Sequence, residues 1–209
     1  MADWVAISSL ATAGGTLALA ATTYASVRSA NRAARAAEGS LLAELRPLLV
    51  ESSEQDPPLR VGFMDHPPFE VPGGGAVAEH VDGRLYVVLS LRNVGPGIGV
   101  LHGGHVSPER VRGRTDHTPI ERFRMLSRDI YIPPGKVGFY QIAFRDEQRE
   151  ERDALIRALD AGAFGVDVLY GDFEGGQRVI TRYNVVRADD GRWQVGTVRH
   201  WQIDRSDPR

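Results

Sequence analysis

The sequence predicts a mainly β protein, in which an N-terminal transmembrane helix precedes an antiparallel β-sandwich with one short connecting helix. Three observations indicate this organisation. The stretch Trp4–Val27 contains no charged residue. From Leu48 onward apolar residues alternate with period 2, and proline and glycine separate the alternating segments, which is typical of an all-β domain. Only residues 146–161 return to the spacing of an amphipathic helix.

The uncharged N-terminal stretch is long enough to cross a bilayer. At a rise of ~1.5 Å per residue it extends over roughly 36 Å as a helix, against a hydrocarbon core of about 30 Å. Alanine, threonine, serine and glycine make up most of it, so this prediction depends on length more than on hydropathy. The side chains expected to anchor it are Trp4, Leu10, Leu17, Leu19 and Tyr24. The alternative is a buried, alanine-rich helix of the folded domain.

Three arginines follow this stretch directly and predict its orientation. Arg28, Arg32 and Arg35 stand on one side of a continuing helix, whereas Asp3 lies in the short N-terminal tail. Because basic residues favour the inner side of a membrane, we expect a single-pass protein of the cell membrane with its C-terminal domain in the cytoplasm. The same arginines could bind anionic membrane lipid, or they could be solvated and act only as a topology signal.

The chain then divides into three parts. Residues 1–27 are the predicted transmembrane anchor, residues 28–47 a juxtamembrane helical linker that Pro47 ends, and residues 48–205 the β-sandwich domain. After the anchor and linker are set aside, enough residues remain for one domain with its own core.

Small residues line one side of the predicted anchor. Gly14, Ala18, Thr22 and Ser26 are spaced four apart, so they form a continuous ridge on a straight helix. Such ridges let two helices approach closely in lipid, which predicts a homodimer through the transmembrane helix. The alternative is that a helix of this composition contains such a ridge by chance.

Eight strands are expected, at residues 48–51, 59–63, 85–92, 98–106, 137–145, 164–170, 178–187 and 192–203. The segment 85–92 is apolar on both faces, which predicts a central strand. Residues 65–83 contain three prolines and a Gly-Gly-Gly run, and we expect a mobile loop there.

Two turns and one helix connect these strands. Pro133-Pro134-Gly135 fits a type II turn, and Asp190-Gly191 fits a hairpin turn. In the helix at 146–161, acidic residues precede an apolar stripe and Gly162 follows it, so we expect a connector across one end of the sandwich.

The turn Leu91-Arg92-Asn93-Val94-Gly95-Pro96-Gly97 resembles the way immunoglobulin-like bacterial modules turn a corner, which suggests an immunoglobulin-like sandwich. Together with the segments 128–133, 170–172 and 200–204, it resembles a group of uncharacterised single-pass membrane proteins from actinobacteria. That resemblance implies a source and a topology, and it implies no site.

His102-Gly103-Gly104-His105 is the only close histidine pair in the sequence. With His80 or Asp172 brought near by folding, the pair could ligate a metal ion. Strand positions three apart point to opposite faces, although the two glycines could form a turn that reunites the rings. Histidines near solvent at a strand end are the alternative interpretation.

The remaining polar residues indicate no catalytic or cofactor site. The chain has no cysteine, no Gly-x-Ser-x-Gly motif and no phosphate-binding glycine loop. Its net charge of −2 gives no electrostatic reason to expect binding to nucleic acid. Four carboxylates stand in predicted tight turns, where we expect them to accept hydrogen bonds from nearby backbone amides: Asp172, Glu174, Asp189 and Asp190. The densest basic stretch comprises Arg110, Arg112, Arg114, Arg122, Arg124 and Arg128, and it is either a solvated face or a surface for an acidic partner or the inner leaflet.

These observations predict a membrane-anchored, non-enzymatic β-sandwich module without a cofactor, which binds an unknown protein partner or serves as an accessory component of a membrane complex. The alternative is a small membrane-bound, metal-dependent hydrolase with its site near His102 and His105. Fold alone does not choose between them, because sandwiches host both roles.

Overall fold

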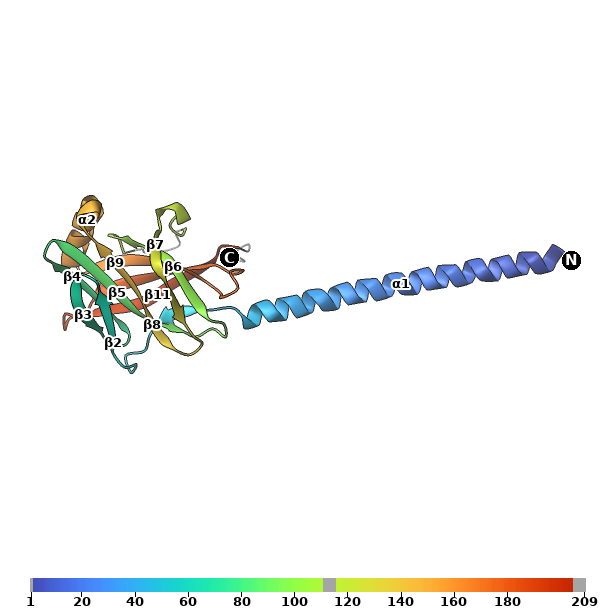
Figure 1. Ribbon diagram of the computed structural model, residues 1–209, viewed down its shortest axis with the longest axis horizontal. Helices are drawn as coiled ribbons and strands as arrows, with labels where there is room; N and C mark the ends of the chain where they lie inside the picture. Colours follow the sequence, from blue (N-terminus) through green and yellow to red (C-terminus); the bar gives the residue numbers. More distant parts are fainter. Residues whose placement is uncertain (1, 111–115, 205–209) are drawn as a thin grey trace. The chain divides into compact units, whose positions relative to one another are not determined.

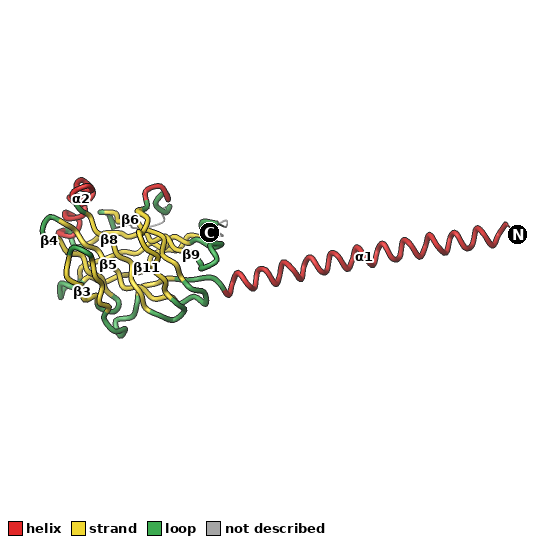
Figure 2. Tube along the Cα trace, in the orientation of Figure 1, coloured by secondary structure: helices red, strands yellow, loops and turns green. Residues whose placement is uncertain are grey.

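The computed structural model describes residues 2–110 and 116–204, and the chain divides into two compact units, Met1–Ala43 and Glu44–Arg209. Figure 1 labels most elements of both units, and Figure 2 shows that the strands belong to the second. Helix α1 spans Ala2–Glu44 without a break, as expected for an alanine-rich sequence. It ends three residues before Pro47, which cannot continue a helix.

The prediction of a membrane-spanning helix is not supported. No helix in the described part of the chain is both long and apolar enough to cross a membrane. The stretch Trp4–Val27 has the length, but alanine, glycine and hydroxyl side chains lower its hydropathy. Its threonines return hydrogen bonds to their own helix, since the hydroxyls of Thr12 and Thr16 each donate to the carbonyl four residues earlier at 2.9 Å.

The second unit contains eleven strands and a second helix among its described residues. The strands are β1 Leu49–Glu51, β2 Leu59–Phe63, β3 His66–Val71, β4 Gly75–Val81, β5 Arg84–Asn93, β6 Gly99–Ser107, β7 Arg124–Ile132, β8 Val137–Phe144, β9 Ala163–Gly171, β10 Val179–Arg187 and β11 Trp193–Gln202. Helix α2 spans Arg149–Asp160. The unit is therefore mainly β, as predicted.

Nine of the strands form one antiparallel sheet that works as two half-sheets. In one half-sheet, β5 pairs with β8 on one edge and with both β4 and β1 on the other. The other half-sheet has the order β11-β10-β9-β6-β7. Among the described strands, the ladder between them consists of two residue pairs, Trp193 with Ala76 and Gln194 with Gly75, and the Val195 amide donates to the Gly74 carbonyl beside them at 3.1 Å. This short connection is one corner of a sandwich.

One core lies between the two half-sheets. It contains buried residues from all nine strands, including the aromatic rings of Tyr140, Phe144, Phe164, Tyr170, Tyr183 and Trp193. Strand β5 confirms the prediction of a central strand, because Leu85, Val87, Leu89 and Leu91 point into this core while Tyr86 packs on the opposite face.

The hairpin β2–β3 covers that opposite face. Val61, Phe69 and Val71 of the hairpin pack against Tyr86 and its neighbours. The expectation of a mobile loop at residues 65–83 is therefore wrong, because this segment forms β3 and β4. Two of its three prolines, Pro67 and Pro68, are accommodated in β3, which pairs with β2 alone among the described strands.

Helix α2 packs against the core by the apolar stripe that the sequence predicted. Leu155, Ala158 and Leu159 are buried in the core cluster. Gly162 then reverses the chain with φ = 79°, a conformation that favours glycine.

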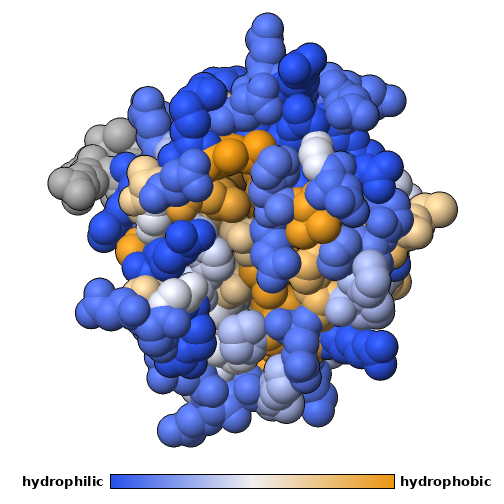
Figure 3. All heavy atoms as spheres, turned by 90° about the vertical axis from the view of Figure 1, so that its left-hand side faces the viewer, coloured by the Kyte–Doolittle hydropathy of each residue, from blue (hydrophilic) through white to orange (hydrophobic). Residues whose placement is uncertain are grey.

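Most of the domain face on the left of Figure 1 is polar or charged, and apolar side chains show only between the polar ones (Figure 3). The immunoglobulin-like arrangement stays a prediction.

Candidate functional site between β7 and β8

The corner of the sandwich opposite the β4–β11 connection is open. Strands β7 and β8 follow one another in the chain through the turn Pro133–Lys136, in which Gly135 has φ = 70° and the Lys136 amide donates to the Pro133 carbonyl at 3.1 Å. Among the described strands, β7 pairs only with β6 and β8 only with β5. Each therefore keeps one unpaired edge toward the other.

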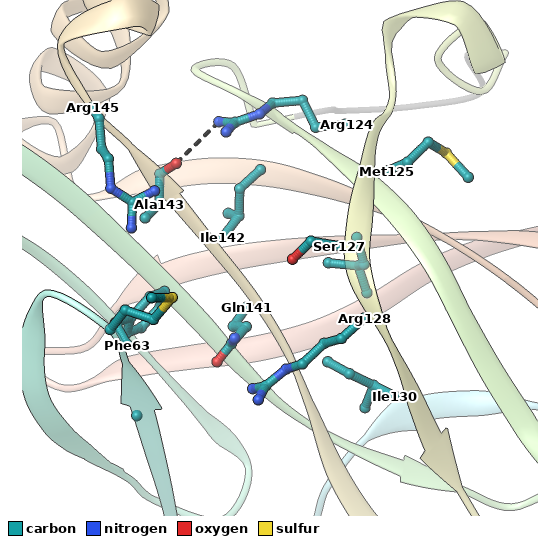
Figure 4. A pocket seen from close by; sticks show the side chains of 13 residues that line it. Phe63, Arg124, Met125, Ser127, Arg128, Ile130, Gln141, Ile142, Ala143 and Arg145 are labelled. Atoms are coloured by element: carbon teal, nitrogen blue, oxygen red, sulfur yellow. Dashed lines mark hydrogen bonds between the residues drawn. The ribbon is translucent and has the colours of Figure 1, made fainter.

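A groove of about 410 Å³ lies at this corner (Figure 4). It is lined by the β2–β3 turn and by both free strands, with the residues Gly62, Phe63, Met64, Arg124, Met125, Leu126, Ser127, Arg128, Ile130, Gln141, Ile142, Ala143 and Arg145. Its volume falls in the range of small-molecule and peptide pockets, roughly 300–1,000 Å³.

Asn93 holds the two strands together near the Pro133–Lys136 turn. Its side chain is fully buried, and its amide group donates to the carbonyls of Gly97 at 2.7 Å and Ile132 at 2.8 Å. Its carbonyl oxygen accepts from the backbone amides of Leu48 at 3.2 Å and Gly95 at 3.0 Å. One side chain therefore ties the end of β7 to the end of β5 and to the segment entering β1.

Farther from the turn, a bulge separates β7 from its only partner. Leu101 pairs with Ile130 and Gly103 pairs with Met125, so residues 126–129 of β7 stand opposite the single residue His102 of β6. Such bulges bend a strand and re-aim its side chains, and they are common beside functional sites. Here the bulge presents Ser127 and Arg128 to the groove.

The free edge of β8 offers main-chain hydrogen-bonding groups to the groove. Successive residues of a strand direct their N–H and C=O groups to opposite edges. The Ala143 carbonyl accepts a hydrogen bond from the Arg124 guanidinium of β7 at 3.1 Å, so Ala143 faces the groove (Figure 4). By alternation, Gln141 and Phe139 direct their main-chain groups to the same edge, and Gln141 lines the groove as well.

Three arginines surround this edge. Arg124 lies 5.0 Å from the centre of the Phe144 ring, in cation–π contact. Arg145 donates to Asp65 at 2.8 Å, and Arg128 extends from β7 toward Gln141 (Figure 4). The side-chain oxygen of Gln141 is buried and has no hydrogen-bond partner. The groove thus combines a free strand edge, a positive rim and an unsatisfied amide oxygen.

The predicted metal site at His102 and His105 has a different structural explanation. In the described part of the chain, no group of three or more histidine, cysteine, aspartate or glutamate residues is arranged to hold a metal ion. His102 lies at the bulge of β6. His105 lies opposite Asp167 in the register of β6 with β9. Burial and the nearby Arg122 charge lower the pKa of His105.

The two glycines between these histidines serve packing. A Cβ atom on Gly103 would lie 2.6 Å from the Arg124 carbonyl oxygen of β7, and one on Gly104 would lie 2.5 Å from the hydroxyl oxygen of Tyr140. Tyr140 is fully buried in the core, and this burial raises the pKa of its hydroxyl. Only glycine leaves room for the neighbouring backbone and ring.

Gly104→Ala is therefore expected to destabilise the protein by about 1–3 kcal/mol, because the buried Tyr140 ring must move. His105→Ala, one position away, is expected to cost about 1 kcal/mol or less, and the metal content should not change. Urea denaturation and elemental analysis of both variants measure these effects. A stoichiometric metal ion that disappears from His105→Ala would support the hydrolase, and an unchanged stability of Gly104→Ala would contradict the packing explanation of the glycine.

The other residues singled out in the sequence divide as follows. Asp172 and Asp190 are turn carboxylates as predicted, since Asp172 accepts from the Gly176 amide at 2.8 Å and Asp190 from the Arg192 amide at 3.0 Å. Of the basic stretch, Arg124 and Arg128 reach the groove, and Arg112 and Arg114 lie outside the described residues.

On α1, the residues that the sequence singled out are exposed wherever their side chains are described. They are Leu10, Gly14, Leu17, Ala18, Leu19, Thr22, Tyr24, Ser26, Arg28, Arg32 and Arg35. The side chain of Trp4 lies outside the description. The proposed lipid contact and the helix dimer both stay predictions.

Sequence reasoning did not identify the groove itself. Arg145 stands at the end of a predicted strand and Arg124 and Arg128 within a basic stretch, and nothing in their spacing places them together. The available signal was the turn Pro133–Lys136, which brings two consecutive strands side by side. That these two strands do not pair is seen only in the folded structure.

Comparison with protein-family models, with curated proteins and with solved structures finds no match to this chain. The resemblance to an actinobacterial membrane protein group therefore stays a prediction.

Proposed function

We propose that this protein is a non-enzymatic binding module that takes up an extended segment of a partner protein by strand addition in the groove between β7 and β8. The observation that carries the proposal is the free edge of β8, where Gln141 and Ala143 line the groove and direct main-chain groups into it. An extended peptide can pair with such an edge, and its main-chain hydrogen bonds supply affinity while side-chain pockets supply specificity.

The surroundings of this edge support binding over simple exposure. Natural proteins usually protect free strand edges by shortening, covering or charging them. Here the unpaired edge of β8 runs over ~17 Å from Phe139 to Ala143, and residues 141–143 of it line the groove. The β2–β3 turn forms a wall of the groove through Phe63 and Met64, so an added strand would be partly enclosed.

A proline on the free edge tests the proposal. In Gln141→Pro the lost N–H is one that faces the groove, so the pairing of β8 with β5 is expected to survive. Gln141→Thr is the matched control, because it changes the side chain and keeps the N–H. Extended ten-residue peptides selected from a random library on the full chain are expected to bind the native protein and Gln141→Thr, and to lose at least tenfold in affinity for Gln141→Pro.

Amide hydrogen exchange gives an independent measurement. Bound peptide is expected to slow exchange at Phe139, Gln141 and Ala143 specifically, because those amides gain hydrogen bonds. If the library yields no binder, or if binders are indifferent to a well-folded Gln141→Pro, the strand-addition function is wrong.

A further inference from the structure

We infer that the segment taken up by the groove is acidic, with carboxylate side chains alternating with apolar ones along an extended partner chain. This inference rests on the strand-addition function proposed above and specifies its ligand. The charges around the groove, the state of Arg124 and the apolar lining carry it, each by a separate observation.

The groove is positive although the chain as a whole is not. The chain has a net charge of −2, yet the described lining of the groove contains three arginines and no acidic residue. Arg128 is exposed, and in the described structure it forms no hydrogen bond or ion pair. A carboxylate is the side chain that pairs best with a free guanidinium, because two parallel hydrogen bonds can form.

Asp65 is the carboxylate that forms ion pairs beside the rim. Asp65 lies 2.8 Å from Arg145 and 3.6 Å from Arg84, so it is shared between two guanidinium groups. The hydrogen bond from Arg145 lowers the pKa of Asp65, which therefore stays ionised at neutral pH. Asp65 and the nearby Glu147 therefore act on Arg145, whereas Arg128 forms no ion pair in the described structure.

Arg124 explains why a carboxylate is needed and not merely tolerated. Its guanidinium donates a hydrogen bond to the Ala143 carbonyl. An added strand would need the same carbonyl as an acceptor. A guanidinium prefers a carboxylate to a neutral carbonyl, because the two charges attract and two parallel hydrogen bonds can form. An acidic side chain of the incoming strand can therefore draw Arg124 away and free the β8 edge, whereas a neutral strand must break this hydrogen bond without compensation.

The apolar lining accounts for the alternation. Phe63, Met64, Met125 and Ile142 lie along the groove, and Met64 and Met125 are exposed. Methionine is flexible and polarisable, so it adapts to varied apolar partners. In an extended strand successive side chains point to opposite sides, and alternation lets one side contact these residues while the other meets the arginines.

A second copy of this chain fits the groove poorly. Pairing through the same edge would bring the arginines of both copies together, and like charges at such an interface repel. The observations therefore favour a partner of opposite charge.

Three capped ten-residue peptides test the inference on the full chain. They alternate valine with glutamate, with glutamine or with lysine, and their affinities are measured by fluorescence anisotropy at about 0.15 M salt. We expect the glutamate peptide to bind at least tenfold more tightly than the glutamine peptide, and the lysine peptide not to bind. The preference should weaken as salt rises, since salt screens exposed charges.

Two variants assign the preference to the groove. Arg128→Gln is expected to lower the affinity for the glutamate peptide about tenfold. Arg157→Gln removes the same charge from the exposed face of α2 and is expected to leave that affinity unchanged. Arg124→Met is expected to raise the affinity for the glutamine peptide about fivefold, because the Ala143 carbonyl is freed. The same variant is expected to lower the affinity for the glutamate peptide.

The outcomes separate this inference from the function on which it rests. Equal binding of the glutamate and glutamine peptides, both lost in Gln141→Pro, would overturn the acidic preference and keep strand addition. Glutamate binding that Gln141→Pro does not reduce would overturn strand addition at this edge. Tighter binding of a single-stranded oligonucleotide than of the glutamate peptide, lost in Arg128→Gln, would overturn the acidic partner in favour of nucleic acid.

Discussion

Asn93→Leu is expected to destabilise the protein by about 5 kcal/mol, the largest effect of any single substitution that this structure suggests. The fully buried amide makes four hydrogen bonds, to the backbone groups of Leu48, Gly95, Gly97 and Ile132. Leucine would leave all four backbone groups without this partner, and each buried unpaired group costs about 1–3 kcal/mol. Because domains are stable by only about 5–15 kcal/mol, much of the variant would be unfolded.

Urea denaturation of the full chain, followed by far-UV circular dichroism, measures this loss. Gln194→Leu is the matched control: it also replaces a side-chain amide on a strand, but at an exposed position of β11, and it should change stability by about 0.5 kcal/mol at most. A loss below 1 kcal/mol in Asn93→Leu would show that the corner is held by other contacts.

Asp167→Ala is expected to cost about 3–5 kcal/mol. Asp167 and Arg182 are neighbours on β9 and β10, only 3% and 5% exposed, and two 2.6 Å hydrogen bonds join them. The Thr118 amide also donates to Asp167 at 3.0 Å, and the Arg182 guanidinium lies 5.0 Å from the centre of the Trp201 ring. Removing the carboxylate leaves a buried positive charge without its counter-ion.

The double variant Asp167→Leu with Arg182→Met is the decisive comparison. Replacing both members of a buried ion pair by apolar residues is often close to neutral, so the double variant should recover most of the stability that Asp167→Ala loses. Both are measured by the same denaturation experiment. If the double variant is as unstable as Asp167→Ala, the hydrogen bond to Thr118 or the packing on Trp201 dominates over the uncompensated charge.

Local patterns in the sequence predicted those elements whose cause is local. The two-faced apolar pattern of residues 85–92 identified β5 as the central strand, and the stripe of Leu155 and Leu159 identified α2. Alanine content and Pro47 predicted a long helix and its end. The same stretch shows a limit of this reasoning, because a helix of spanning length need not have spanning hydropathy.

Three strands were missed, each because its pattern is interrupted. Adjacent prolines obscure β3, and β4 follows a Gly-Gly-Gly run that reads as loop. Strand β7 contains the bulge at residues 126–129, which breaks the period-2 alternation in its middle. The bulge is defined by pairing with β6, so no window of the β7 sequence alone reveals it.

The sequence by itself therefore determined the mainly β class, the central strand, the two helices and the turns, because each follows from the period of neighbouring residues. Only the tertiary structure decided that β7 and β8 lie side by side without pairing, and that Arg124, Arg128 and Arg145 meet at the groove between them. Alternation tells which face of a strand is buried, but not which edge finds a partner. That choice depends on contacts between distant residues, such as those of Asn93 with β1 and β7, and the proposed binding site depends on the edge that was left free.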